Sequence, residues 1–147
     1  MIIQMRGLED VILKFGRLPA IIEEEIEIAV GIAARDIRER ANDEHNWVSR
    51  TGDTERNGID VELDGMVGVV RLATPNAIGL HEGRPAHIIK PRNKMALRFP
   101  LGGVLVFASR VKHPGNKPDP YLFDAADKET PAIMARFDVV VARALRD

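Results

Sequence analysis

One helical run of apolar residues, at 19–44, constrains the fold of this chain more than any other feature. Its apolar side chains recur at spacings of three and four, which is the period of one face of an α-helix. They are Ile22, Ile26, Ala29, Val30, Ala33, Ile37 and Ala41. We therefore predict one long helix over 19–44, with this stripe turned toward the core.

Three further isoleucines, Ile21, Ile28 and Ile32, lie outside that stripe. At 100° per residue they fall about 140° around the helix from the centre of the first stripe. One packing partner therefore covers both sets poorly. Two explanations stay open: a second contact surface, or a helix that its own domain wraps more deeply. We keep the three isoleucines as candidate protein-interface residues.

The segments beside this helix are shorter or more polar. Residues 8–18 predict a short helix, which Pro19 separates from the long one. Residues 45–58 contain two glycines and few apolar side chains. They predict a mobile loop whose only anchors are Trp47 and Val48.

Residues 59–112 predict a β-rich region. Asp64-Gly65 stands between two runs of β-favouring residues, which is a strong hairpin signal. Before it, Ile59, Val61 and Leu63 alternate with acidic residues, which predicts a strand with one buried face. A second strand pair is predicted between HIIKP and MALRFP around the turn RNK, followed by a further strand in GGVLVFASRVKHP.

The last segment, 119–147, predicts a C-terminal amphipathic helix. Thr130 is expected as its N-cap and Pro131 as its first helical residue. The order of elements indicates an α+β fold, in which a mostly antiparallel sheet is packed on one face by the long N-terminal helix and the C-terminal helix. The length of 147 residues fits a single domain, 1–147.

The sequence offers few groups for chemistry. It has no cysteine, which excludes disulfides, thiolate metal sites and cysteine nucleophiles. The closest approach to a metal site is His81, Glu82 and His87, whose spacing fits no common zinc arrangement. The two serines, Ser49 and Ser109, lie in no nucleophile motif. We expect no enzyme activity, no metal and no cofactor.

No run approaches the roughly 18 apolar residues of a membrane helix. Charged residues interrupt the N-terminal segment, which therefore lacks the apolar core of a signal peptide. We expect a soluble protein of a reducing compartment, without a membrane partner.

Charge is segregated along the chain, although the net charge is only −1. Residues 1–83 hold 16 acidic and 9 basic side chains, and residues 119–147 hold 6 and 4. The segment between them has no acidic residue and eight basic ones: Arg84, Lys90, Arg92, Lys94, Arg98, Arg110, Lys112 and Lys117. Such segregation favours attraction to a polyanion or between opposite faces of neighbouring copies. Its two phenylalanines, Phe99 and Phe107, lie in strand-like runs, so we expect them to pack in the core rather than stack on bases.

A stiff joint, VKHPGNKPDPYLFDAA, links the β-rich region to the last helix. Pro114-Gly115 turns the chain, and the prolines that follow keep it extended before a helix can begin. Stiffness lowers the entropy cost of docking, so Tyr121 and Leu122 could fill a pocket in the same subunit or in a neighbour. The simpler interpretation is a rigid corner that seats the last helix on the sheet.

Three stretches of residues 76–126 carry a resemblance to a known family. They are NAIGLHEGRP, HIIKPRNKMALRFP and GGVLVFASRVKHPGNKPDPYLFDAA, in this order. Together they resemble the head–tail connector family of tailed bacteriophages, described as tail-component, neck or tail-completion proteins of long-tailed phages. Upstream, Thr51-Gly52 fits the Thr-Gly-x-Leu-Arg stretch of that family, but the Leu-Arg pair is missing here.

The resemblance implies a structural virion protein that assembles as a ring at the head–tail joint. Its partners would be further copies of itself, connector and tail proteins, and DNA that passes through the ring. It would be located in the virion, and in the host cytoplasm during assembly. We expect the basic hairpin, with Lys90, Arg92 and Lys94, to face either an acidic neighbour or the lumen. The alternative is a small nucleic-acid-binding module that uses the basic segment 84–117.

Overall fold

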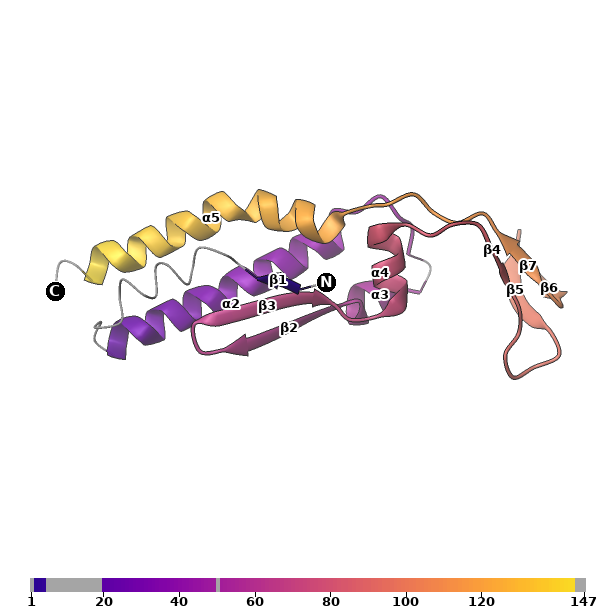
Figure 1. Cartoon of the computed structure of the whole chain (residues 1–147), viewed down its shortest axis with the longest axis horizontal. Coiled ribbons are helices and arrows are strands. Elements are labelled where there is room, and N and C mark those ends of the chain that lie inside the picture. The colour runs from indigo at the N-terminus through magenta and orange to yellow at the C-terminus, as the bar shows by residue number, and fades with distance from the viewer. Residues whose placement is uncertain (1, 5–19, 50, 145–147) are drawn as a thin grey trace.

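The computed structural model describes residues 2–4, 20–49 and 51–144, with the side chains of residues 22–49 and 51–144. Two parts are distinguished here: the body, made of residues 2–4, 20–83 and 118–144, and the arm, made of residues 84–117. In Figure 1 the body is a long stack of two helices and a small sheet, and the arm projects from one of its ends. The predicted helix at 8–18 lies outside the described residues.

The long helix α2 spans Ala20–Asp43, which confirms the prediction for 19–44. Its predicted apolar stripe is buried, and Val30, Ala33 and Ala41 are fully enclosed. This stripe packs against the last helix on one side and against the sheet on the other (Figure 1). Helix α2 is therefore the central layer of the body.

The sheet of the body has three antiparallel strands, β1 (Ile2–Gln4), β2 (Ile59–Asp64) and β3 (Val67–Leu72), in the order β1-β3-β2. The predicted hairpin between β2 and β3 is confirmed. Its loop is Gly65-Met66, one residue later than Asp64-Gly65, because Asp64 still pairs with Val67. Gly65 has a φ of 56°, the left-handed backbone that glycine adopts without steric cost.

The expected buried face of β2 is only partly buried. Ile59 is 3% exposed and Val61 is half-buried, but Leu63 is 49% exposed. Gly68 lies opposite Leu63 and packs closely on Val30 of α2. Having no side chain, Gly68 leaves Leu63 uncovered at the turn end of the hairpin.

The C-terminal helix α5 spans Tyr121–Ala144, and the predicted start at Thr130 is wrong. Pro131 lies inside the helix, and the hydroxyl of Thr130 donates to the carbonyl oxygen of Ala126 at 2.8 Å. The helix begins at Tyr121, ten residues before Pro131, because Tyr121, Leu122 and Ala125 already supply a buried face.

The predicted mobile loop at 45–58 contains a short helix, α3 (Asp53–Asn57). Trp47 packs against the core as expected. Val48 is 86% exposed, so the prediction that it anchors this segment is wrong.

A further helix, α4 (Pro75–Glu82), was not predicted. Thr74 is its N-cap, because the hydroxyl oxygen of Thr74 accepts the backbone N–H of Ala77 at 3.2 Å. Pro75 follows at a first-turn position, where a missing N–H costs nothing. Gly79 is helical rather than a turn residue, whereas Gly83 ends the helix with a φ of 82°.

These elements confirm the α+β class with antiparallel pairing throughout the described strands. Helices α2 and α5 lie on one face of the three-stranded sheet, with α5 outermost (Figure 1). No helix within the described residues is both long enough and apolar enough to cross a membrane.

Candidate docking surface on the β-arm

The arm is a two-stranded antiparallel ribbon built from two consecutive strand pairs. Strand β4 (His87–Ile89) pairs with β7 (Val111–His113), and β5 (Leu97–Leu101) pairs with β6 (Val104–Ala108). The predicted pairing of HIIKP with MALRFP around RNK is therefore wrong. The reversal of the chain lies at Gly102-Gly103, whose φ angles are 58° and 83°.

The two halves of the ribbon differ in register, and this creates a loop. Ile89 pairs with Val111 and Leu97 pairs with Ala108. Residues 90–96 thus stand opposite only Ser109 and Arg110, so the longer side bulges away from the ribbon (Figure 1). We name residues 90–96 the cationic loop and residues 97–108 the tip ribbon.

The cationic loop contains three basic side chains, Lys90, Arg92 and Lys94, all exposed. Met95, in the same loop, is 98% exposed. Since the loop comes from one strand and not from a hairpin turn, its position depends on both strand pairs beside it.

The arm has no core of its own. Every residue of 84–117 is described, and none of them is buried. An isolated two-stranded ribbon is marginally stable in water, because it removes little apolar surface from solvent. The arm therefore has little burial of apolar surface of its own to stabilise it.

Both faces of the tip ribbon are mostly apolar, which distinguishes it from a surface hairpin with one wet face. One face carries Arg98 and three exposed apolar residues, of which Leu105 is 51% and Phe107 is 66% exposed. The expectation that Phe107 packs in the core is wrong, while Phe99 is half-buried. The opposite face is entirely apolar and consists of Leu97, Phe99, Leu101, Val104, Val106 and Ala108.

The remaining predicted cations follow the arm toward the body. Lys112 is exposed and stands opposite Ile88 in the β4–β7 pair, and Lys117 is exposed at the end of the arm. Arg84 differs, since its guanidinium donates to the carbonyl oxygen of Pro75 and lies over Gly79. The structure therefore gives Arg84 a role in attaching the arm to α4.

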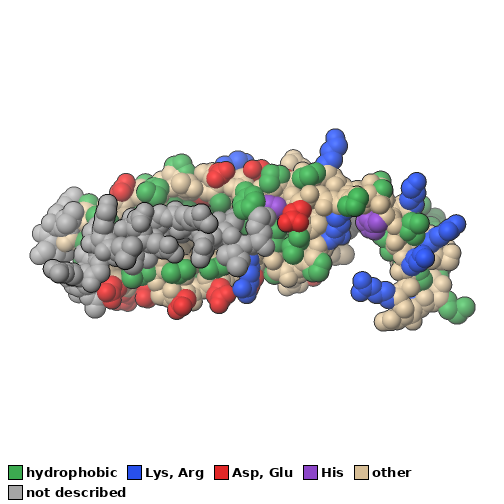
Figure 2. All heavy atoms as spheres, viewed as in Figure 1, with side chains coloured by type: hydrophobic (Ala, Val, Ile, Leu, Met, Phe, Trp, Pro, Cys, Tyr) green, Lys and Arg blue, Asp and Glu red, His purple; other side chains and the backbone are tan. Residues whose placement is uncertain are grey.

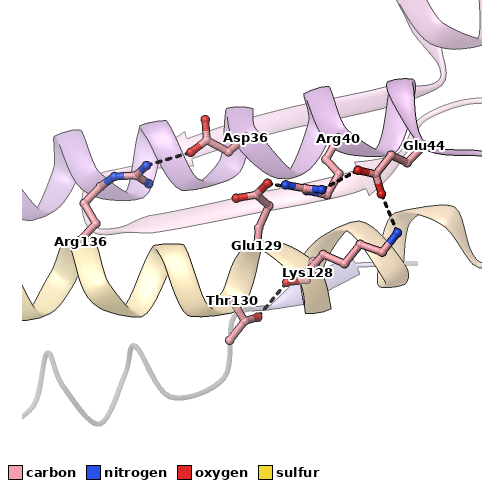
Figure 3. A network of polar contacts seen from close by, with 8 residues as sticks. Asp36, Arg40, Glu44, Lys128, Glu129, Thr130 and Arg136 are labelled. Carbon is pink, nitrogen blue, oxygen red and sulfur yellow. Dashed lines mark hydrogen bonds and ion pairs between the residues drawn. The ribbon is translucent and has the colours of Figure 1, made fainter.

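Among the described residues of the body, five of the eight cations form ion pairs with carboxylates of the body. Figure 3 shows ion pairs that join α2 to α5: Arg136 to Asp36 at 3.0 Å, and Arg40 to Glu129 at 2.5 Å. Glu44 extends this network to Lys128. Within the described part of the chain, no ion pair involves a residue of the arm. Figure 2 shows the unpaired Lys and Arg side chains spread over the arm.

The root of the arm is held by backbone contacts that only glycine permits. Arg84 and Asn116 exchange two backbone hydrogen bonds of 3.0 Å. A Cβ on Gly115 would lie 2.2 Å from the carbonyl oxygen of Arg84, and Gly115 has a φ of 82°. The predicted turn at Pro114-Gly115 is thus also a close crossing of the two strands of the arm. Gly83 makes a similar approach to Pro118.

The joint after the arm is a rigid corner. Tyr121 and Leu122 are 1% and 0% exposed and lie in the core of the same chain, as the simpler interpretation of this joint predicted. The backbone N–H of Asp119 donates to the carbonyl oxygens of Leu80 and His81, both at 3.1 Å. The carboxylate of Asp119 accepts the backbone N–H of Asn46 at 2.7 Å. The corner therefore connects α4, the segment after α2 and the start of α5.

Two ionisable side chains of this corner are perturbed by burial. Desolvation raises the pKa of Tyr121 to about 12, because the phenolate would lose its hydration. Desolvation also lowers the pKa of His81, which favours the neutral imidazole. Both effects disfavour a charge on these two side chains of the corner.

His87 and His113 face each other across the β4–β7 pair, with ring centroids 4.9 Å apart. Nδ1 of His113 accepts the backbone N–H of Gly115 at 3.0 Å. This hydrogen bond fixes the position of the His113 ring at the root. Within residues 22–49 and 51–144, no three His, Asp or Glu side chains gather as metal ligands would.

The candidate isoleucines of α2 lie on the body, away from the arm. Ile28 is 56% exposed and Ile32 is half-buried; the side chain of Ile21 is outside the description. The structure therefore does not bring these isoleucines together with the arm cations in one subunit (Figure 1).

No protein-family model, no curated protein and no solved structure matches the chain. Sequence reasoning identified the cations of the arm but missed the exposed tip ribbon. The available signal was the absence of polar alternation in LRFPL and VLVFA, which separates these strands from β2.

Proposed function

We propose that this protein is a structural component of a tailed-phage virion, which assembles as a ring at the joint between head and tail. The observation that supports this proposal is an arm of 34 residues with exposed cations, two apolar faces and no buried residue. Such an arm suits binding to another protein, which would cover the apolar surface. The motif resemblance of residues 76–126 supplies the phage context.

Ring assembly needs two different surfaces that fit each other, one on each side of a subunit. The arm, with eight cations and no acidic residue, is one such surface. The rest of the chain carries a net charge of −9, since the whole chain carries −1. This opposition of charge favours contact between unlike surfaces of neighbouring copies. In this role the protein binds connector and tail proteins in the virion and catalyses no reaction.

The proposal is tested by reversing charge in the cationic loop. Arg92→Glu with Lys94→Glu should block head-to-tail joining in an infection complementation assay, while the purified variant stays folded. Arg38→Glu with Arg56→Glu is the matched control, because it makes the same change in net charge on the body at two cations that form no ion pair within the described residues. Normal yields of infectious particles from the loop variant, at normal protein levels, would contradict the proposal.

A small nucleic-acid-binding module is the second candidate, favoured by the eight cations of the arm. In that case the purified wild type should bind duplex DNA with an affinity that falls steeply as salt rises. The loop variant should then lose DNA binding, whether or not any other protein is present. Absence of DNA binding at low salt would exclude this second candidate.

A further inference from the structure

We propose that the tip ribbon of one copy docks head to tail on an apolar patch at the α2–β2 side of a second copy. The patch consists of Ile28 and Leu63, and we name it the α2–β2 patch. This inference rests on the proposed function in that it specifies the contact between ring subunits.

The need for a partner follows from the tip ribbon itself. Leu101, Val104, Leu105 and Phe107 are each more than half exposed, on a ribbon without a buried residue. Contiguous apolar surface of this kind marks an interaction site. Because both faces are mostly apolar, a partner that covers one face leaves the second available for a further contact.

A second arm is a poor partner for the tip ribbon. Each arm carries eight positive charges and no acidic residue, so two arms in contact would repel each other. The body of a second copy has the opposite charge. Charge complementarity therefore assigns the occupant of this surface to the body of another copy.

On the body, the α2–β2 patch combines exposed apolar side chains with an acidic rim. Ile28 is 56% and Leu63 is 49% exposed. They are connected through Gly31, one helical turn after Ile28, where a Cβ would lie 3.5 Å from Leu63 Cδ1. The rim consists of the exposed side chains Glu24, Glu27, Glu62 and Asp64.

The α2–β2 patch with its rim and the tip ribbon are complementary in apolar character and in charge. Apolar side chains would meet apolar side chains, and the carboxylates of the rim would meet Lys94, beside the tip ribbon, and Arg98, within it. Within the described residues, Glu24, Glu27 and Asp64 have no ion-pair partner. Among the described strands, β2 is an edge strand in the order β1-β3-β2, so backbone pairing with the ribbon can accompany the contact.

A chain cannot make this contact with itself. The turn between β2 and β3 and the first half of α2 lie at one end of the body, and the arm leaves from the other end (Figure 1). A contact between two different surfaces on separate copies repeats from copy to copy, and it closes into a ring or continues as a filament. This is the assembly that a head–tail joint requires.

Two variants that each disable one surface test the inference. The ribbon variant is Leu105→Asp with Phe107→Asp, and the patch variant is Ile28→Asp with Leu63→Asp. The control variant, Met134→Asp with Val139→Asp, changes two residues of α5 that are 54% and 57% exposed. All six positions are at the surface, so the folded state should persist in each variant, as circular dichroism would show.

Light scattering and sedimentation should detect concentration-dependent association of the wild type and the control variant at low ionic strength. The ribbon and patch variants should each associate at least about tenfold more weakly, because a buried carboxylate opposes the contact. An equimolar mixture of the two variants should form a dimer and nothing larger, since it contains one intact ribbon and one intact patch. Added salt should weaken association of the wild type.

Several results would overturn the inference. They are a wild type that stays monomeric at its highest soluble concentration, variants that associate normally, and a mixture that forms no dimer. Binding of the wild-type arm to DNA or to anionic vesicles without self-association would assign the tip ribbon to another occupant. Normal joining of heads and tails by variants that no longer self-associate would contradict the proposed function and leave this contact standing. Blocked joining by the loop variant, together with unchanged self-association of the patch variant, would contradict this contact and leave the proposed function standing.

Discussion

Replacing Gly115 by alanine should open the root of the arm without unfolding the body. Gly115 has a φ of 82°, and an added Cβ would lie 2.2 Å from the carbonyl oxygen of Arg84. A non-glycine residue in left-handed backbone costs about 1 kcal/mol. The clash adds to this cost, because the two strands must separate and lose the two hydrogen bonds between Arg84 and Asn116.

Each of these hydrogen bonds contributes about 1 kcal/mol, so the total is about 3 kcal/mol. At 1.4 kcal/mol per factor of ten, amide exchange of Arg84 and Asn116 should accelerate about 100-fold. Gly102→Ala is the matched control, because Gly102 has a φ of 58° but nothing within 4 Å of its added Cβ. It should cost about 1 kcal/mol and leave the root amides unchanged. Hydrogen exchange followed by NMR measures both variants, and equal exchange of the root amides in the two would refute this reasoning.

Two further predictions concern pH. Tyr121 is the single tyrosine, so ultraviolet titration of the folded protein should show phenolate formation only near pH 12. An exposed tyrosine has a pKa of about 10, so the free energy of unfolding should fall as pH rises from about 10 toward 12. Titration of the folded protein near pH 10 would contradict the burial of this side chain. His81 has a lowered pKa through desolvation, so the unfolded state takes up its proton first and stability should fall as pH drops below about 6.5. In His81→Phe this loss should be smaller, and an identical pH dependence of unfolding in both proteins would show that His81 does not cause it.

The elements that the sequence predicted well are those whose signal is local. The apolar stripe of α2 recurs at helical spacing from Ile22 to Ala41 within a helix of 24 residues, and the packing of the body is compatible with it. The hairpin β2–β3 followed from Asp-Gly between two β-favouring runs, although the paired position of Asp64 moved its loop by one residue. In both cases neighbouring residues determine the conformation.

The arm was mispredicted because its register depends on pairing between distant residues. RNK has the composition of a turn, yet Gly102-Gly103 reverses the chain without steric strain and lets β5 pair with β6. The seven residues of the cationic loop then have no strand opposite them. A Thr-Pro pair does not by itself determine where a helix begins. Thr74-Pro75 stands at the start of α4, whereas Thr130-Pro131 lies within α5, because buried apolar residues before Thr130 extend that helix.

The candidate surface was predicted in its charge and missed in its apolar part. Counting charged residues identifies the arm cations directly, since no acidic residue interrupts them. Exposure of Leu105 and Phe107 depends on the absence of any layer above the ribbon. A sequence pattern cannot distinguish an apolar strand that is buried in a core from an apolar strand that is exposed at the surface.

Amide exchange across the tip ribbon, in the dilute monomer and in the assembled protein, tests the docking role of the arm most directly. The amides of β5 and β6 should exchange rapidly in the monomer, because no residue of the ribbon is buried, while the amides of α2 stay protected. On assembly the β5 and β6 amides should become strongly protected. A ribbon that is already as protected as α2 in the monomer, or that stays unprotected after assembly, would contradict the account.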